Sequence, residues 1–234
     1  MRNFVYSYAS DAKKLTASAV VALVMLCSAG AQDMSSLEAR KAMNKYAKKE
    51  LTVKASKAAR KAAKSYARDG WEVAPGHLPL EKQLDRAYSM QYEFDESGYP
   101  LYLMSEAMSV GGSYDAAKLQ AMELSKLQLA GQISSEIIGI IENTVGNDQL
   151  SQDEAASVVE TISASKNVIS QRLGRVITVV ECYRTLPNKN KEVRVQIAYN
   201  SKMAMENAKS VVKEELEKKG EKLHERLDSL LKLN

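Results

Sequence analysis

Two neighbouring runs of β-branched residues in the C-terminal half of this 234-residue chain constrain its fold most. The first, Arg175–Thr185, is dense in Val and Ile, and the second, Glu192–Tyr199, alternates apolar with polar side chains. A period of two is typical of strands with one buried face. The polar segment Pro187–Asn190 between them is short enough for a tight connection. The sequence therefore predicts a β-hairpin.

Helical patterns surround this hairpin. A further strand is predicted at Leu101–Val110, and a long helix with a wide apolar face follows it as far as Val145. Ser151 and Glu154 form the capping box of a second helix, which ends at Gly174. This order predicts an α+β fold, in which two central helices cover one face of a small antiparallel or mixed sheet of three to four strands.

Long helices are predicted to flank this core at both ends. Leu37–Arg68 contains no Gly or Pro, and its apolar residues recur at helical spacing. Ser201 opens a final amphipathic helix of about thirty residues, whose apolar positions continue past what one small sheet could cover. Its far end could form a coiled coil with the N-terminal helix or with a second molecule.

The first thirty-one residues have the three parts of a secretory signal peptide. Basic residues charge the start, and Thr16–Cys27 is an apolar run shorter than the roughly 20 residues of a bilayer span. Small residues then precede a predicted cleavage after Ala31. A lipidated cysteine is normally preceded by a small residue, but Cys27 is preceded by Leu26. Soluble export is therefore predicted rather than lipidation of Cys27.

These patterns divide the chain into a signal peptide (1–31), a basic N-terminal helix (32–70), an α+β core domain (71–201) and a C-terminal amphipathic helix (202–234). The mature chain would keep Cys182 as its single cysteine, which cannot form an internal disulfide. We expect it to be buried and inert. The predicted location is the periplasm, or the outer membrane and cell surface, of a Gram-negative bacterium.

The core follows a recognisable succession of elements. A strand closed by small residues, Tyr102–Gly112, leads into an Ala-rich helix over 116–133, and Leu173–Arg184 and Val193–Tyr199 follow later. This succession resembles the family of small outer-membrane lipoproteins and flagellar-assembly N-terminal domains, over about half of the mature chain. The resemblance implies an envelope-associated protein, and it carries over no catalytic residue.

Residues suited to catalysis or metal binding are few. His77 and His224 lie far apart in the sequence and lack the closely spaced partners that zinc sites need. The chain contains no GxSxG motif and no glycine-rich nucleotide motif. We therefore expect no enzymatic activity, no metal and no cofactor. Trp71 and Tyr99 are loop aromatics that could line a pocket or close over the edge of the core.

The distribution of charge is more informative than the net charge of +4. Leu37–Arg68 holds eleven Lys and Arg residues against Glu38 and Glu50, a balance of +9. Residues 69–234 hold 19 basic and 25 acidic residues, a balance of −6. The basic helix could fold against its own acidic body, or it could bind an anionic partner. Nucleic acid is disfavoured, because export removes that partner. The candidate binding residues are Lys48, Lys49, Lys54, Lys57, Arg60, Lys61, Lys64 and Arg68.

The sequence thus predicts an exported envelope protein of structural, adaptor or binding type. Its expected partners are envelope proteins or an anionic membrane or polysaccharide surface, with a homo-oligomer as a further possibility. Two alternatives remain open: an exported hydrolase with its site near the His77 loop, and an oligomeric structural protein assembled through its terminal helices. The hydrolase requires a pocket in which a serine or carboxylate meets His77 within hydrogen-bonding distance.

Overall fold

The computed structural model describes residues 52–146 and 150–220, together with Glu38, Lys41, Lys45 and Leu227. The chain forms two compact units, Met1–Lys54 and Ala55–Asn234, and the second unit contains all the elements described below. The predicted signal peptide, Cys27, Lys48, Lys49 and His224 lie outside the described residues.

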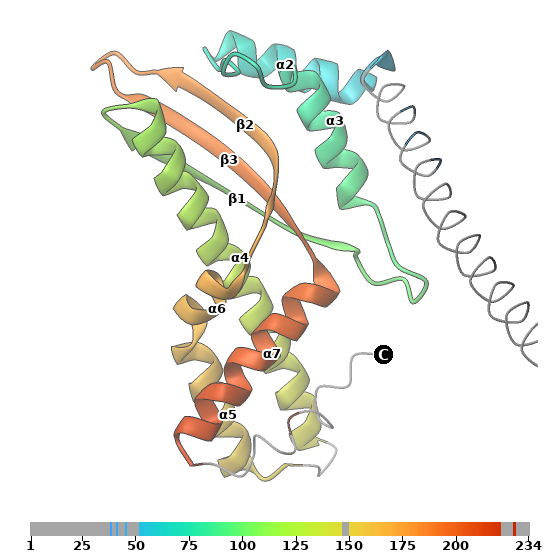
Figure 1. Ribbon diagram of the computed structural model, residues 1–234, viewed down its shortest axis with the longest axis vertical. Helices are drawn as coiled ribbons and strands as arrows, with labels where there is room; N and C mark the ends of the chain where they lie inside the picture. The colour runs from blue at the N-terminus through green and yellow to red at the C-terminus, as the bar shows by residue number, and fades with distance from the viewer. Residues whose placement is uncertain are drawn as a thin grey trace, which may run out of the picture. The chain divides into compact units, whose positions relative to one another are not determined.

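The second unit is an α+β fold, as predicted (Figure 1). Its elements in chain order are α2 (Lys57–Arg68), α3 (Leu80–Gln91), β1 (Tyr102–Gly111), α4 (Tyr114–Gly146), α5 (Gln152–Ala164), α6 (Lys166–Arg172), β2 (Ile177–Thr185), β3 (Lys191–Asn200) and α7 (Ser201–Lys218).

The three strands form one antiparallel sheet in the order β1-β3-β2. The predicted hairpin is present as β2 and β3, and its turn includes Lys189 in the left-handed backbone region. The register places Ala107 of β1 opposite Val195 of β3, and Tyr183 of β2 opposite Val193. An irregularity between Thr178 and Val180 shifts the register of β2 at its start.

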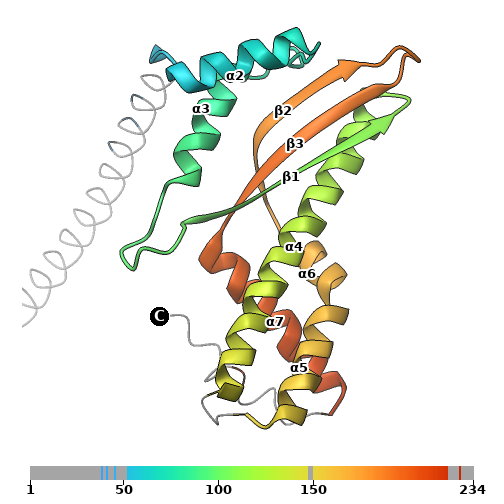
Figure 2. The same ribbon diagram turned by 180° about the vertical axis from the view of Figure 1, so that it is seen from behind.

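Helices cover both faces of the sheet, not one face as predicted (Figures 1 and 2). Alternate β3 side chains, Val193, Val195 and Ile197, pack against α4 in the larger core. Ala198 of β3 and Val180 of β2 face the other way and pack with α2 and α3 in a smaller core. The central strand is therefore buried on both sides, because its even-numbered positions carry an apolar residue as well.

The second half of α4 extends past the sheet, and α5, α6 and α7 pack around it (Figure 1). The fully buried side chains at this end include Ile133, Ile137, Ile141, Val158, Ile162, Ile169 and Leu216. The predicted capping box at Ser151 and Glu154 is confirmed at the start of α5. These helices form a small bundle that continues the core of the sheet.

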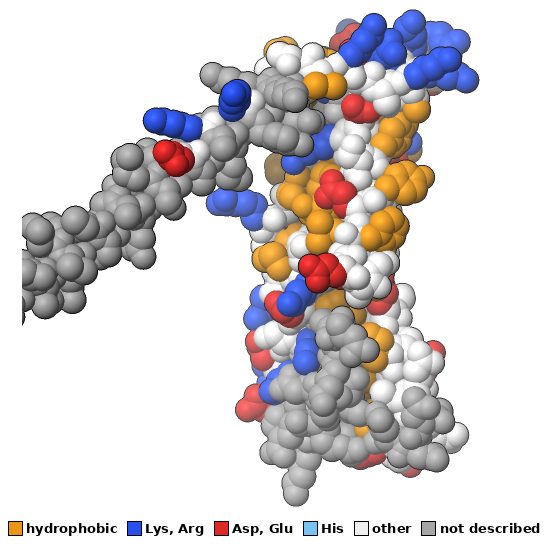
Figure 3. Space-filling model, turned by 90° about the vertical axis from the view of Figure 1, so that its right-hand side faces the viewer, with side chains coloured by type: hydrophobic (Ala, Val, Ile, Leu, Met, Phe, Trp, Pro, Cys, Tyr) orange, Lys and Arg blue, Asp and Glu red, His pale blue; other side chains and the backbone are white. Residues whose placement is uncertain are grey.

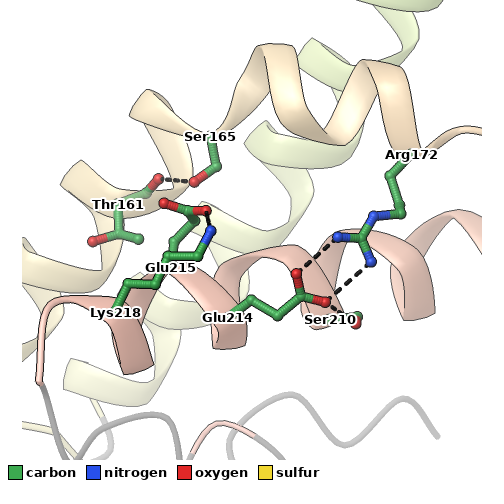
Figure 4. Close-up of polar contacts among 7 residues, drawn as sticks. All are labelled: Thr161, Ser165, Arg172, Ser210, Glu214, Glu215 and Lys218. Atoms are coloured by element: carbon green, nitrogen blue, oxygen red, sulfur yellow. Dashed lines mark hydrogen bonds and ion pairs between the residues drawn. The ribbon is translucent and has the colours of Figure 1, made fainter.

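The predicted second helix, 151–174, is divided into α5 and α6 at Ser165 (Figure 4). The Ser165 hydroxyl donates to the Thr161 carbonyl at 2.7 Å, a back-bond that bends helices. Beyond the bend, the Arg172 guanidinium forms two hydrogen bonds, of 3.0 and 2.8 Å, with the Glu214 carboxylate on α7. The bend thus brings α6 alongside α7.

Both predicted terminal helices are interrupted within the described residues. Residues 53–56 are not helical, and α2 begins at Lys57, where the Ser56 hydroxyl accepts the Ala59 N–H. The predicted C-terminal helix is interrupted because α7 ends at Lys218 and Gly220 adopts a positive φ of 73°. Three apolar positions of this predicted helix, Val212, Leu216 and Leu227, are buried in the core of the same chain.

The close approach of β1 to α4 gives a test of this packing. A Cβ added at Gly111 would lie 3.0 Å from the backbone nitrogen of Ala117, whereas one added at Gly112 would meet nothing within 4 Å. We expect Gly111→Ala to lower the free energy of unfolding by about 1–2 kcal/mol through overpacking. Gly112→Ala is the matched control and should be nearly neutral in denaturant titrations. Equal effects of the two substitutions would contradict this packing.

Candidate functional site

The exposed side of α2 carries basic residues from the predicted binding segment. Lys57, Lys61, Lys64 and Arg68 are all exposed, and their spacing of four, three and four residues places them on one side of the helix. We call these four residues the basic face. No ion pair joins the basic face to a carboxylate among residues 52–146 and 150–220. On the face of the molecule drawn in Figure 3, Lys and Arg side chains gather at the upper end, where both α2 and the turn between β2 and β3 lie in Figure 1.

Two other predicted residues have different surroundings. Lys54 is exposed but belongs to the first unit. Arg60 is half-buried, and its Nε donates to the Ala55 carbonyl at 3.0 Å. Arg60 therefore stabilises the entry to α2 and is not part of the basic face.

The opposite side of α2 is anchored to the sheet by aromatic and cationic groups. The Arg194 guanidinium of β3 lies 5.1 Å from the Tyr66 ring and 5.6 Å from the Trp71 ring, both within cation–π range. Arg194 also donates to the Tyr66 hydroxyl and pairs with Glu106 of β1 at 3.0 Å. Arg184 of β2 stacks over Trp71 at 4.8 Å. Trp71 thus closes the edge of the core, one of the two roles considered for it, and it lines neither of the two cavities described below.

Cys182 of β2 lies beneath this anchored helix and is fully buried, as predicted. Burial raises the pKa of its thiol to about 12, and the nearby Arg194 only partly opposes that effect. Because the thiolate is the reactive form, this cysteine is poorly suited to nucleophilic or redox chemistry.

A buried carboxylate, Glu181 of β2, organises a second group of polar residues. Its Oε1 lies 2.8 Å from Lys118 Nζ and 3.5 Å from His77 Nε2, and it accepts a hydrogen bond from the Tyr114 hydroxyl. The Glu181 backbone N–H donates to Gln83 Oε1 of α3 at 2.7 Å. Burial, and then the bond to Glu181, raises the pKa of Tyr114, so this hydroxyl remains a donor. The His77 loop and α4 therefore meet at the carboxylate of β2, and α3 binds the backbone beside it.

A small cavity of about 320 Å³ adjoins Glu181, and His77, Arg86 and Thr178 contribute to its lining. The structure places this carboxylate beside the partly exposed ring of His77. The sequence contains one signal of this group: Glu181 is a single carboxylate within a run of apolar β-strand residues. No group of three potential metal ligands occurs among the described residues.

A larger cavity of about 780 Å³ lies where the bundle meets the end of the sheet. Tyr99 lines this cavity, so this loop aromatic has the other of the two roles considered for it. Its hydroxyl donates to Glu136 Oε2 of α4 at 2.8 Å. Asp95 holds the preceding turn by accepting the N–H groups of Ser97 and Tyr99, each at 2.9 Å. The Ser97 hydroxyl also donates a hydrogen bond to Asp95, and this bond lowers the pKa of the Asp95 carboxyl most. The two backbone N–H bonds lower the pKa further.

No protein-family model, no curated protein and no solved structure matches the chain. The resemblance to envelope proteins therefore stays a prediction from the sequence. No helix in the described part of the chain is both long and apolar enough to cross a membrane.

The chemistry of Cys182 can be tested directly. At mildly alkaline pH, its raised pKa and its burial should prevent reaction with an aromatic disulfide reagent. In a Cys27→Ser variant, we expect no measurable release of the chromophore from the native protein and one equivalent after unfolding in guanidinium. Rapid reaction of the native protein would show that β2 is accessible at this position.

Proposed function

We propose that this protein is an exported, non-enzymatic binding protein that attaches to an anionic phospholipid surface of the cell envelope through the basic face. The observation that carries this proposal is the basic face itself: four exposed cationic side chains with no carboxylate partner among the residues that the structure describes. A helix that served only to neutralise its own acidic body would pair these lysines internally.

The packing of α2 favours attachment at the membrane surface over insertion. Ala59 is fully buried against the protein, and Tyr66 is held by Arg194, so the apolar side of the helix is not available to lipid. Each Lys or Arg near an anionic bilayer contributes about 1 kcal/mol, which falls off within a Debye length. The basic face alone would then contribute roughly 4 kcal/mol at low salt.

The preceding basic residues of the sequence add to this charge. Lys48, Lys49 and Lys54 belong to the same +9 segment as the basic face. The predicted signal peptide and the resemblance to envelope proteins support the location. A protein with an adaptor role would be held at the membrane by this segment and would present the rest of its surface to other envelope proteins.

Charge reversal tests the proposal. We expect the mature chain to co-sediment with vesicles containing phosphatidylglycerol, and not with neutral phosphatidylcholine vesicles, at low ionic strength. The triple variant Lys57→Glu, Lys61→Glu, Lys64→Glu should bind at least about a hundredfold more weakly, because three attractions become repulsions. Binding by the unchanged protein should also decline steeply between low and physiological salt.

The matched control makes the same change in charge at three other exposed residues. It is the triple variant Lys166→Glu, Arg175→Glu, Lys202→Glu. This control should retain most of the binding. Equal weakening in both triple variants, or binding that ignores salt, would contradict the role of the basic face. Retention of the protein by a soluble anionic polysaccharide, without any binding to vesicles, would overturn the choice of phospholipid.

The group around Glu181 favours a second candidate function, an exported hydrolase. A carboxylate lies 3.5 Å from His77 Nε2 beside a cavity of about 320 Å³, and together they could activate a water molecule as an acid–base pair. Lys118 and Tyr114 already bind the same carboxylate oxygen, so a water molecule would have to compete with them for it.

His77→Asn tests the hydrolase directly, because this side chain is partly exposed and its replacement should leave the fold intact. If the protein hydrolyses an ester or amide in a substrate panel, this variant should lose about a hundredfold or more in rate. Arg86→Gln changes another exposed residue that lines the cavity and serves as the control. Activity that survives unchanged in His77→Asn would exclude this site.

A further inference from the structure

The larger cavity has the dimensions of a small-molecule site. It lies between the turn before β1, the C-terminal half of α4 and the start of α7. Its volume of about 780 Å³ falls within the range of roughly 300–1,000 Å³ typical of ligand pockets. All three segments belong to the second unit of the chain. It is separate from the basic face, since no residue of α2 lines it.

One part of the cavity wall is apolar. Leu101 comes from the segment before β1, Ile140 from α4 and Met205 from α7, and Pro100 lies beside them. Met205 is buried, while Leu101 and Ile140 are partly exposed at the cavity. Such a surface would gain about 25 cal/mol for each Å² of apolar ligand that it covers.

Carboxylates mark another part of the wall. Glu136 accepts the Tyr99 hydroxyl through Oε2, and no described residue forms a hydrogen bond to its Oε1. Asp95 receives its three side-chain hydrogen bonds through Oδ1, which leaves Oδ2 without a partner among the described residues. Burial, and then the bond to Glu136, raises the pKa of Tyr99 to about 12, so its hydroxyl stays protonated and its ring stays neutral.

The balance of charge at the cavity is negative. Lys202, on the exposed first turn of α7, is the one cationic residue in the lining, and it forms no ion pair with Asp95 or Glu136. Two carboxylates beside an aromatic ring form an environment that attracts a cation, and the ring face adds a cation–π contribution.

An independent observation comes from Gly139, an interior residue of the C-terminal half of α4. A Cβ added there would meet nothing within 4 Å, so packing does not require glycine at this position. Glycine in a helix interior nevertheless costs about 1 kcal/mol relative to alanine. Gly139 lines the cavity, and its missing side chain keeps the space in front of it open. By contrast, Gly111 is required by the close approach of Ala117.

We infer that this cavity binds an organic cation with an apolar body, such as an alkyl or aryl ammonium compound. The ammonium group would lie near Glu136 and Asp95, against the Tyr99 ring. The apolar body would cover Leu101, Ile140 and Met205. This site does not depend on the attachment of the basic face to a membrane, so either proposal can fail without the other.

Ligand-observed NMR with hexyltrimethylammonium tests the site, with hexanoate and hexanol as probes of equal chain length but different charge. We expect saturation transfer from the protein to the cation that exceeds the transfer to either control. Glu136→Gln should weaken binding of the cation about tenfold or more, because it removes a carboxylate and keeps the shape of the side chain. Equal or tighter binding of hexanoate would overturn the assignment.

Gly139 provides a steric test with a matched pair. Gly139→Phe should abolish binding of the cation, since the ring would project into the cavity. Gly139→Ala should retain binding and raise the melting temperature, because alanine favours the helix and leaves most of the space open. Melting curves of both variants verify folding. Binding that survives in Gly139→Phe would place the ligand elsewhere and refute the proposal.

Discussion

Burial of the central strand on both faces is the constraint on which the rest of this structure depends. Val195 faces α4 in the larger core, while Ala198 faces α2 and α3 in the smaller core. Two buried hydroxyls fix α4 against the sheet: Ser125 donates to the Val195 carbonyl at 3.1 Å, and Ser105 of β1 donates to the Ser125 carbonyl at 2.7 Å. Because buried polar groups need partners, these bonds define one position of α4 along the strands.

The position of α4 determines where the larger cavity forms. Its first half lies on the sheet, and its second half emerges past the end of the strands to gather α5, α6 and α7 (Figure 2). β3 passes directly into α7, with Asn200 as the cap of the helix. The larger cavity lies at this junction, where a sheet edge and a helical bundle meet and their side chains do not fill the space between them.

The smaller core fixes α2 in a different way. Its buried side chains at the helix are alanines, so apolar area contributes little, and the cation–π contacts of Arg194 with Tyr66 and Trp71 supplement it. Orientation of α2 by these contacts turns Lys57, Lys61 and Lys64 toward solvent. The basic face is therefore exposed because the opposite side of the same helix is occupied.

Local patterns predicted the strands, the capping box at Ser151 and the long helix after Gly112, since each depends on neighbouring residues alone. The predicted helices were wrong where a tertiary contact or a side-chain hydrogen bond outweighed local helix propensity. Alanine-rich sequence favours a continuous helix through 53–56, but Ala55 is buried in the smaller core, Ser56 caps α2 and its N–H donates to Asp85. The bend at Ser165 likewise comes from one hydroxyl, which periodicity does not detect.

The sequence by itself determined the antiparallel hairpin and the concentration of positive charge before residue 69, because alternation and composition encode these directly. Only the tertiary structure decided that helices cover both faces of the sheet, that His77 and Glu181 meet, and that the space in front of Gly139 stays open. These features join segments far apart in the chain. Their positions depend on which faces pack together, and the spacing of residues within one segment carries no record of that choice.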